Sequence, residues 1–164
     1  MVVVVSDTST LSALIVVDRL DVLKSIYSHL LIPPAVHAEL LTLAQFEIDL
    51  SVYLAADWIQ VAEPQDRGRV EELRTELDLG EAEAISLALE REASMLIIDE
   101  TTGRAVALKL GIPIKGLLGI LIEAKIRGEL EVIKPLLDRL INEANFRVAS
   151  SLYERVLRTV GEAE

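Results

Sequence analysis

Two apolar runs, each followed at once by a carboxylate, constrain the fold of this chain more than any other feature. The run from Val2 to Ser6 leads into Asp7, and the run from Met95 to Ile98 leads into Asp99. Short β-branched and aliphatic runs of this kind are typical of parallel strands that are buried on both faces. Open α/β sheets bind ligands in the crevice outside the carboxyl ends of their strands. If the two strands are neighbours, Asp7 and Asp99 meet there, and their mutual repulsion favours a bound divalent cation.

The rest of the chain alternates between short apolar runs and segments with helical periodicity, which predicts a three-layer α/β/α domain around a central parallel sheet. We expect a single domain over residues 1–164, because this length supports one proper core and is too short for two. Further strands are expected at residues 30–32, 58–61 and 111–114. Helices are expected after Thr8 or Ser9, which can cap the first one, and at residues 18–28, 33–40, 46–55, 70–77, 81–92, 101–110, 117–127, 135–145 and 149–160.

The composition excludes several classes of protein. Hydrophobic residues make up 51% of the chain and charged residues 26%, which indicates a globular rather than a disordered protein. There is no cysteine, so disulfides and thiolate metal sites are excluded. No basic segment precedes the first strand, and charges interrupt every apolar stretch before it reaches the length of a membrane span. We therefore expect a cytoplasmic protein without a membrane segment.

The charge is unevenly distributed along the chain. The net charge of −11 argues against nucleic acid as a partner. However, residues 1–100 hold six Lys/Arg and 19 Asp/Glu, whereas residues 101–140 hold seven Lys/Arg and four Asp/Glu. The seven bases are Arg104, Lys109, Lys115, Lys125, Arg127, Lys134 and Arg139. An acidic pocket beside a modestly basic ridge is compatible with a phosphodiester substrate, and equally with plain variation of the surface.

Other acidic residues stand near the predicted starts of helices. Glu39 follows Pro33-Pro34, and Glu81 and Glu83 belong to the segment Gly80-Glu81-Ala82-Glu83-Ala84. Three of the acids have an ordinary explanation: Glu39 as a solvated residue, Glu81 as a partner of the helix dipole, and Asp7 as an N-cap. Glu83 is less well explained, because the helix that follows it is apolar. Taken together with the two strand ends, they favour one shared acidic site.

In order and spacing, these motifs resemble the PIN domain, and most closely small prokaryotic PIN proteins related to VapC-type toxins. The resemblance rests on Asp7-Thr8-Ser9, Glu39-Leu40, Gly80-Glu81-Ala82-Glu83-Ala84-Ile85, Leu96-Ile97-Ile98-Asp99-Glu100, Gly103-Arg104, Gly111-Ile112-Pro113-Ile114-Lys115-Gly116 and Glu123-Ala124-Lys125. It implies a Mg²⁺- or Mn²⁺-dependent endoribonuclease that cleaves single-stranded RNA, and possible service as the toxin of a toxin–antitoxin pair. One departure is that Ile97 and Ile98 stand where many members place a threonine or serine before the fourth acid.

The resemblance also implies a role for each acidic residue. The catalytic metal ligands would be Asp7, Glu39, Glu83 and Asp99. Ser9 would lie near the first ligand, Glu81 is the alternative to Glu83, and Glu100 is the alternative to Asp99. Hard divalent ions take oxygen ligands, so His29 and His37 are not required and are expected to be structural or on the surface.

Phosphate contacts and partners complete the prediction. Arg104 and Lys115 follow the site in sequence and can hold phosphates. A homodimer is expected from the apolar helices around Leu14-Ile15 and Leu117–Ile122, and the toxin hypothesis adds an antitoxin protein as partner. Two alternatives remain open: a phosphotransfer or phosphatase domain with Asp7 as nucleophile, and a non-catalytic interaction protein that keeps the fold.

Overall fold

The computed structural model describes residues 2–163, in which five parallel strands form one sheet in the order β3-β2-β1-β4-β5. The strands are β1 (Val4–Ser6), β2 (Leu30–Ile32), β3 (Ile59–Val61), β4 (Met95–Ile97) and β5 (Ile114–Lys115). The chain builds outward from β1 to β3 and then returns to the other side of β1 to add β4 and β5. The predicted pairing of the first and fourth strands is confirmed, with Val5 opposite Leu96 and Ser6 opposite Ile97.

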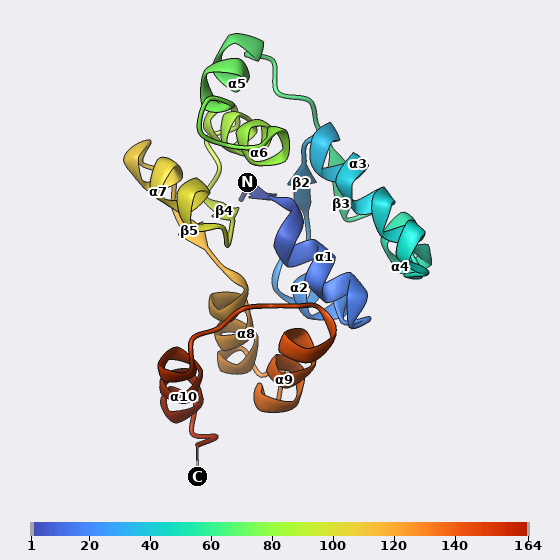
Figure 1. The fold of residues 1–164 in the computed structure, drawn as a ribbon, viewed down its shortest axis with the longest axis vertical. Helices are drawn as coiled ribbons and strands as arrows, with labels where there is room; N and C mark the ends of the chain where they lie inside the picture. Colours follow the sequence, from blue (N-terminus) through green and yellow to red (C-terminus); the bar gives the residue numbers. More distant parts are fainter. Residues whose placement is uncertain (1, 164) are drawn as a thin grey trace.

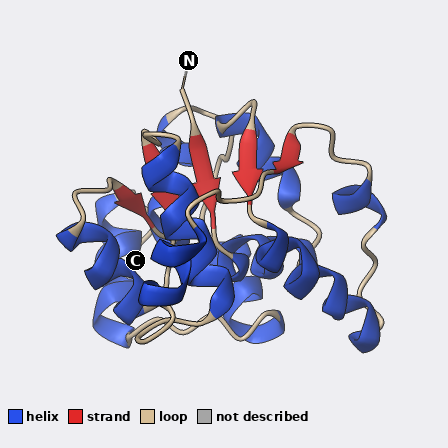
Figure 2. Ribbon diagram, turned by 90° about the horizontal axis from the view of Figure 1, so that it is seen from above, coloured by secondary structure: helices blue, strands red, loops and turns tan. Residues whose placement is uncertain are grey.

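Helices cover both faces of the sheet, which gives the three-layer α/β/α architecture that the sequence predicts (Figures 1 and 2). The first helices are α1 (Thr8–Val16), α2 (Leu20–Ile26), α3 (Pro34–Leu41), the 3₁₀ helix η1 (Thr42–Phe46) and α4 (Ser51–Leu54). They are followed by α5 (Arg67–Leu73), α6 (Leu79–Glu90), α7 (Thr101–Lys109), α8 (Leu117–Ile126), α9 (Lys134–Glu143) and α10 (Ser150–Thr159).

Alternation along the strands divides the apolar core into two parts, one on each face. Val4 and Ile97 face one cluster, whereas Val5, Leu96 and Ile98 face the other. Successive side chains of a strand point to opposite faces, so a strand that is apolar throughout can fill both layers. Both faces of the central strands are thus covered by helices, and a site can form at the carboxyl ends of these strands.

Several local predictions differ from the structure. The strand expected at residues 111–114 is found at Ile114–Lys115, and the helix expected at residues 70–77 is found at Arg67–Leu73. The helix expected at residues 46–55 is interrupted, because Glu47 adopts a left-handed conformation (φ 60°) that ends η1, and α4 begins only at Ser51. Gly80 does not precede its helix as expected. It lies in the first turn of α6, which begins at Leu79 behind an N-cap at Asp78.

The last three helices, α8, α9 and α10, pack together in the lower part of Figure 1 and are tied by one carboxylate near the end of the chain. Glu162 Oε2 accepts a hydrogen bond from Lys125 Nζ at 2.7 Å. The same carboxylate accepts from the backbone N–H groups of Ile133 and Lys134, at the start of α9. These bonds satisfy N–H groups that a helix leaves without an internal partner. Glu162 therefore joins α8, α9 and the segment after α10.

Candidate metal centre

Asp7 is the most deeply buried acid of the candidate site. It follows β1 directly, and its backbone N–H donates to the carbonyl of Ile97 at 3.0 Å. This bond fixes Asp7 at the carboxyl ends of β1 and β4. Its side chain is only 3% exposed, and Ser9 Oγ donates to it at 3.4 Å. Burial, and then the neighbouring charge of Asp99, raise the pKa of Asp7 to about 8.

Glu39 reaches the same place from α3. Thr8 Oγ1 donates a hydrogen bond to Glu39 Oε2 at 2.6 Å, which joins the first residue of α1 to the middle of α3. Gly80, in the first turn of α6, makes this approach possible, because a Cβ atom there would collide with the Glu39 carboxylate. Burial raises the pKa of Glu39, although the bond from Thr8 offsets part of the effect.

Glu81 stands in the first turn of α6 and lacks a partner for one buried oxygen. Its Oε2 atom makes no hydrogen bond, and it lies only 2.7 Å from the position that a Cβ atom on Gly103 would take. Burial, and then the charges of Asp78 and Glu100, raise the pKa of Glu81 to about 8. An oxygen that is desolvated, unpartnered and repelled by its neighbours is suited to a cation.

Asp99 is held from two sides. Thr10 Oγ1 donates to its Oδ2 atom at 2.8 Å, and the backbone N–H of Leu117, at the start of α8, lies 3.1 and 3.2 Å from its two carboxylate oxygens. This places a negative charge at the positive end of the helix dipole, which stabilises it. Asp99 is therefore oriented by both α1 and α8, on the two sides of the crevice.

An acidic hollow of about 270 Å³ collects three of these groups, Asp7, Glu39 and Glu81, whereas Asp99 lines the neighbouring space. The hollow is lined by Asp7, Thr8, Ser9, Ser12, Glu39, Asp78, Glu81 and Glu100. No Lys or Arg belongs to this lining, so nothing in it balances the five carboxylates. Over residues 2–163, no group of three or more His, Asp or Glu side chains is close enough to share an ion in the present arrangement.

Asp78 belongs to the hollow and was not singled out in the sequence. Its side chain accepts a hydrogen bond from the backbone N–H of Glu81 at 2.8 Å, which makes it the N-cap of α6. An Asp followed three residues later by a Glu is a known signature of a helix start, so the pattern Asp78-Leu79-Gly80-Glu81 carries the signal that would have found it. Glu100 caps α7 in the same way, and the bond from the Gly103 backbone lowers its pKa.

The structure corrects the expected position of Glu83. It is buried outside the hollow, where Oε2 pairs with Arg67 at 2.7 Å and Oε1 accepts from the backbone N–H of Ala35 at 2.9 Å. Glu81 and Glu83 are two residues apart on one helix, about 200° around its axis, so they cannot face the same hollow. Glu83 thus fixes the start of α3, the helix that carries Glu39.

The structure also corrects the expected basic ridge, because most of its cations are paired with acids of this chain. Lys115 pairs with Glu123 at 3.2 Å and Lys125 with Glu162 at 2.7 Å. Three more bases pair with acids of the same helix, namely Arg127, Lys134 and Arg139. Among the described residues, no ion pair joins Arg104 or Lys109 to an acid.

Arg104 keeps its expected place at the site. Its Nη1 atom donates to the carbonyl of Ile98 at 3.0 Å and lies 2.7 Å from the position of a Cβ atom on Gly116. The same Gly116 position would be 2.6 Å from Asp99 Oδ1, so the guanidinium and the carboxylate both lie beside this glycine. His37, by contrast, contacts Tyr53 through its Nδ1 atom at 2.6 Å, and neither His29 nor His37 lines the hollow.

The chain matches the DUF3368 family profile, which is described as a PIN domain, over residues 3–162. This match covers nearly the whole chain. The protein belongs to this PIN domain family. No curated protein matches it as a relative. PIN domains have a nuclease-type fold that generally works with divalent metals, which agrees with the acidic hollow at the β1–β4 switch point.

Most of the apolar residues that suggested a homodimer of this PIN domain are covered within one chain, whereas Leu118 and Ile122 are partly exposed. Leu14, Ile15, Leu117, Ile120 and Leu121 are buried in the core formed with α2 and α9. They therefore give no support to a dimer interface, and the homodimer stays a prediction. Over the described residues, no helix is both long and apolar enough to cross a membrane.

Proposed function

We propose that this PIN domain is a metal-dependent nuclease that cleaves single-stranded RNA internally. The observation that supports this most is the acidic hollow itself. Acids from four separate segments converge at the switch point of the sheet, and their lining holds no cation. Crowding of this kind costs stability in the free protein, so a positive ligand would be bound strongly by the folded state.

The donor set fits Mg²⁺ or Mn²⁺. All available donors are carboxylate or hydroxyl oxygens, which hard divalent ions prefer, and Glu81 Oε2 has no hydrogen bond that an ion would have to displace. We propose Asp7, Glu81 and Asp99 as the central ligands, with Glu39 beside them. Asp78 and Glu100 would add negative charge. Glu81 replaces Glu83 in this set, because Glu83 is already engaged by Arg67.

Hydrolysis of a phosphodiester adds a water oxygen to phosphorus, breaks one P–O bond and delivers a proton to the leaving oxygen. A bound divalent ion supplies the positive charge that lowers the pKa of the attacking water and stabilises the charge on the phosphoryl group. The chain's own residues orient the acids: Thr10 and the Leu117 N–H fix Asp99, and Thr8 fixes Glu39. Arg104, above Asp99, is placed to bind a phosphate oxygen.

The choice of RNA, and the possible role as a toxin with an antitoxin partner, rest on the resemblance to VapC-type proteins. Cytoplasmic location stays a prediction from the composition of the sequence. The family, which has a nuclease-type fold, favours this function over the phosphotransfer alternative.

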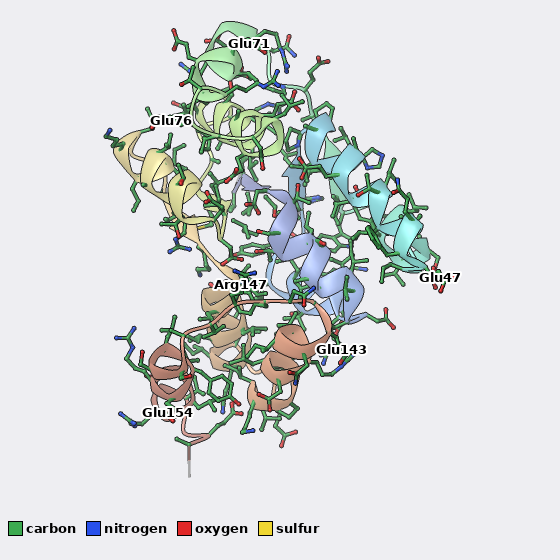
Figure 3. All side chains as sticks on the ribbon, viewed as in Figure 1. Glu47, Glu71, Glu76, Glu143, Arg147 and Glu154 are labelled. Atoms are coloured by element: carbon green, nitrogen blue, oxygen red, sulfur yellow. The ribbon has the colours of Figure 1, made fainter. Side chains whose placement is uncertain are left out.

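Cleavage of a labelled single-stranded RNA with Mn²⁺, with EDTA and with Asp7→Asn tests the proposal. A matched control is Glu154→Gln, since Glu154 is an exposed acid on α10, far from the hollow (Figure 3). We expect cleavage by the wild type and the control with Mn²⁺, and none by Asp7→Asn. If the wild type cleaves neither RNA nor single-stranded DNA with Mn²⁺, the non-catalytic interaction protein becomes the better explanation.

A further inference from the structure

A second and much larger cleft opens beside the acidic hollow. Its volume is about 980 Å³, and Ser9 and Glu100 line both spaces, so the two adjoin each other. Its floor comes from Asp99, β5 and the start of α8, and its outer wall comes from the segment between α9 and α10. In Figures 1 and 3 this segment crosses in front of α8, and Arg147 lies on it, close to the end of the sheet that carries the acids.

Two arginines line this cleft without an ion pair among the described residues. Arg104 and Arg147 both line it, and in residues 2–163 neither forms an ion pair with an acid. Lys115 also lines it, although Glu123 neutralises that charge. Arg147 is exposed. Two unpaired guanidinium groups, one at each side of a cleft in an acidic protein, are placed to bind an anionic chain.

An aromatic ring stands next to the outer cation. Phe146 is half-buried, packs against the core, and is positioned by a hydrogen bond from its backbone N–H to the Leu140 carbonyl at 3.0 Å. It lines the cleft together with Ile114, Leu118 and Leu152. Aromatic rings beside phosphate-binding cations are the usual means of holding the unpaired bases of single strands, because every base has a flat face that can stack.

We propose that the segment between α9 and α10 is the strand-binding wall of this nuclease, with Phe146 stacking on an unpaired base and Arg147 contacting the adjoining phosphate. Arg104, next to Asp99, holds the phosphate nearer the acids. This inference rests on the proposed nuclease function. It adds the path of the substrate: a single strand of RNA leaves the acidic hollow past Arg104 and runs along the cleft to Arg147. A duplex would present no unpaired base to Phe146 and is expected to bind less well.

Binding of a fluorescent single-stranded RNA, measured by anisotropy in EDTA over a range of salt concentrations, tests this path without requiring cleavage. Phe146→Ala is expected to weaken binding about tenfold. Arg147→Gln is expected to weaken it about threefold and to reduce the salt dependence by about one released counterion. The same protein preparations, given Mn²⁺, then report cleavage separately.

Matched controls exist for both substitutions. Phe46→Ala changes an aromatic residue that is 71% exposed and lines neither space. Arg91→Gln removes an exposed cation near the amino ends of the strands, at the opposite end of the sheet from the acids. Both should bind RNA as the wild type does. Because Phe146 also packs against the core, Phe146→Leu provides a variant that keeps apolar volume and lacks the flat ring. Its RNA affinity should fall as in Phe146→Ala, while its melting temperature stays close to that of the wild type.

The outcomes separate this inference from the proposed function. If Phe146→Leu and Arg147→Gln bind RNA as tightly as their controls, the strand does not follow this wall, whether or not the protein cleaves RNA. The same conclusion follows if the wild type binds no single strand, or binds duplex RNA equally well. If the variants lose affinity as expected but the wild type never cleaves with Mn²⁺, the proposed strand-binding role of the segment is supported and the nuclease proposal fails.

Discussion

The pKa values of acidic residues shift in opposite directions in two regions of this protein, the α8–α10 helices and the acidic hollow. In the α8–α10 region, burial alone would raise the pKa of Glu162, yet the bonds from Lys125, Ile133 and Lys134 lower it overall. Glu143 has its pKa lowered by Arg139 in the same way. In the acidic hollow, Asp7 and Glu81 have no cation, and burial raises the pKa of each to about 8.

This difference separates acids that stabilise the folded state through pairing from buried acids that destabilise it. A chain with 27 acids and 16 bases can still pair most of its bases, and here it pairs them away from the hollow. Buried acids without partners oppose folding. Their collection at the switch point of the sheet is therefore best understood as a site prepared for a positive ligand.

Asp7→Asn should give the largest effect, because it alters the most buried acid of the hollow. We expect RNA cleavage with Mn²⁺ to fall at least about 100-fold, since a lost ligand weakens both metal binding and the chemical step. The metal-free variant should melt at a higher temperature than the wild type, because an amide avoids the cost of burying an ionisable carboxyl group beside Asp99. Loss of activity with a lowered melting temperature would instead indicate that Asp7 supports the fold.

The metal-free protein should lose stability as the pH rises from about 4 to about 8. Asp7 and Glu81 have folded-state pKa values near 8, above their ordinary values of 3.8 and 4.5, so in this range the folded state holds more protons than the unfolded state. We expect the melting temperature in EDTA to fall by roughly 5–10 °C across this window. Mn²⁺ should restore most of the loss at pH 8, and Asp7→Asn should flatten the profile. A melting temperature that rises with pH would contradict the shifted pKa values.

Glu83→Ala should destabilise the protein by about 2 kcal/mol, measured by urea unfolding. The change leaves the Ala35 N–H without its acceptor and removes the partner of Arg67, which is itself 47% exposed. Glu83→Gln keeps the acceptor for Ala35 and serves as the comparison, with a smaller loss. If Glu83→Ala abolishes cleavage in a protein of unchanged stability, Glu83 acts at the reaction centre after all.

Arg139→Gln should have the smallest effect, because its partner Glu143 lies four residues away on an exposed face of α9 and solvent screens the pair. The measurement is again urea unfolding, at low and high salt, and we expect no resolvable change in the unfolding midpoint. A clear, salt-dependent loss of stability would mean that the ion pairs of the α8–α10 region stabilise the fold substantially.

Much of this arrangement can be predicted from the sequence. Buried parallel strands are the ordinary outcome for runs such as Val2–Ser6 and Met95–Ile98, and the acids that follow them must meet once the strands pair. The partners of Lys134 and Arg139 can also be predicted, because each stands four residues before an acid on one helix.

The choice between Glu81 and Glu83 could not be made in this way. Both precede alanine and belong to one apolar helix, so the pattern does not show which of the two faces the carboxyl ends of β1 and β4. The decision depends on where α6 begins and on the distant partners of Glu83, namely Arg67 and Ala35. Long-range partners of this kind, like the role of Phe146 in the cleft wall, follow only from the assembled fold.

The strand order has a consequence for how this protein folds during its synthesis. β1 is the first strand of the chain, but its neighbour β4 is made roughly 90 residues later, and Asp7 and Asp99 cannot meet before both are in place. Contacts between residues so far apart in sequence carry a high entropic cost of closure and form late in folding. A growing chain on the ribosome therefore has no complete acidic hollow until β4 has emerged and paired. The acids that we propose to bind the metal therefore come together only late in the synthesis of the chain.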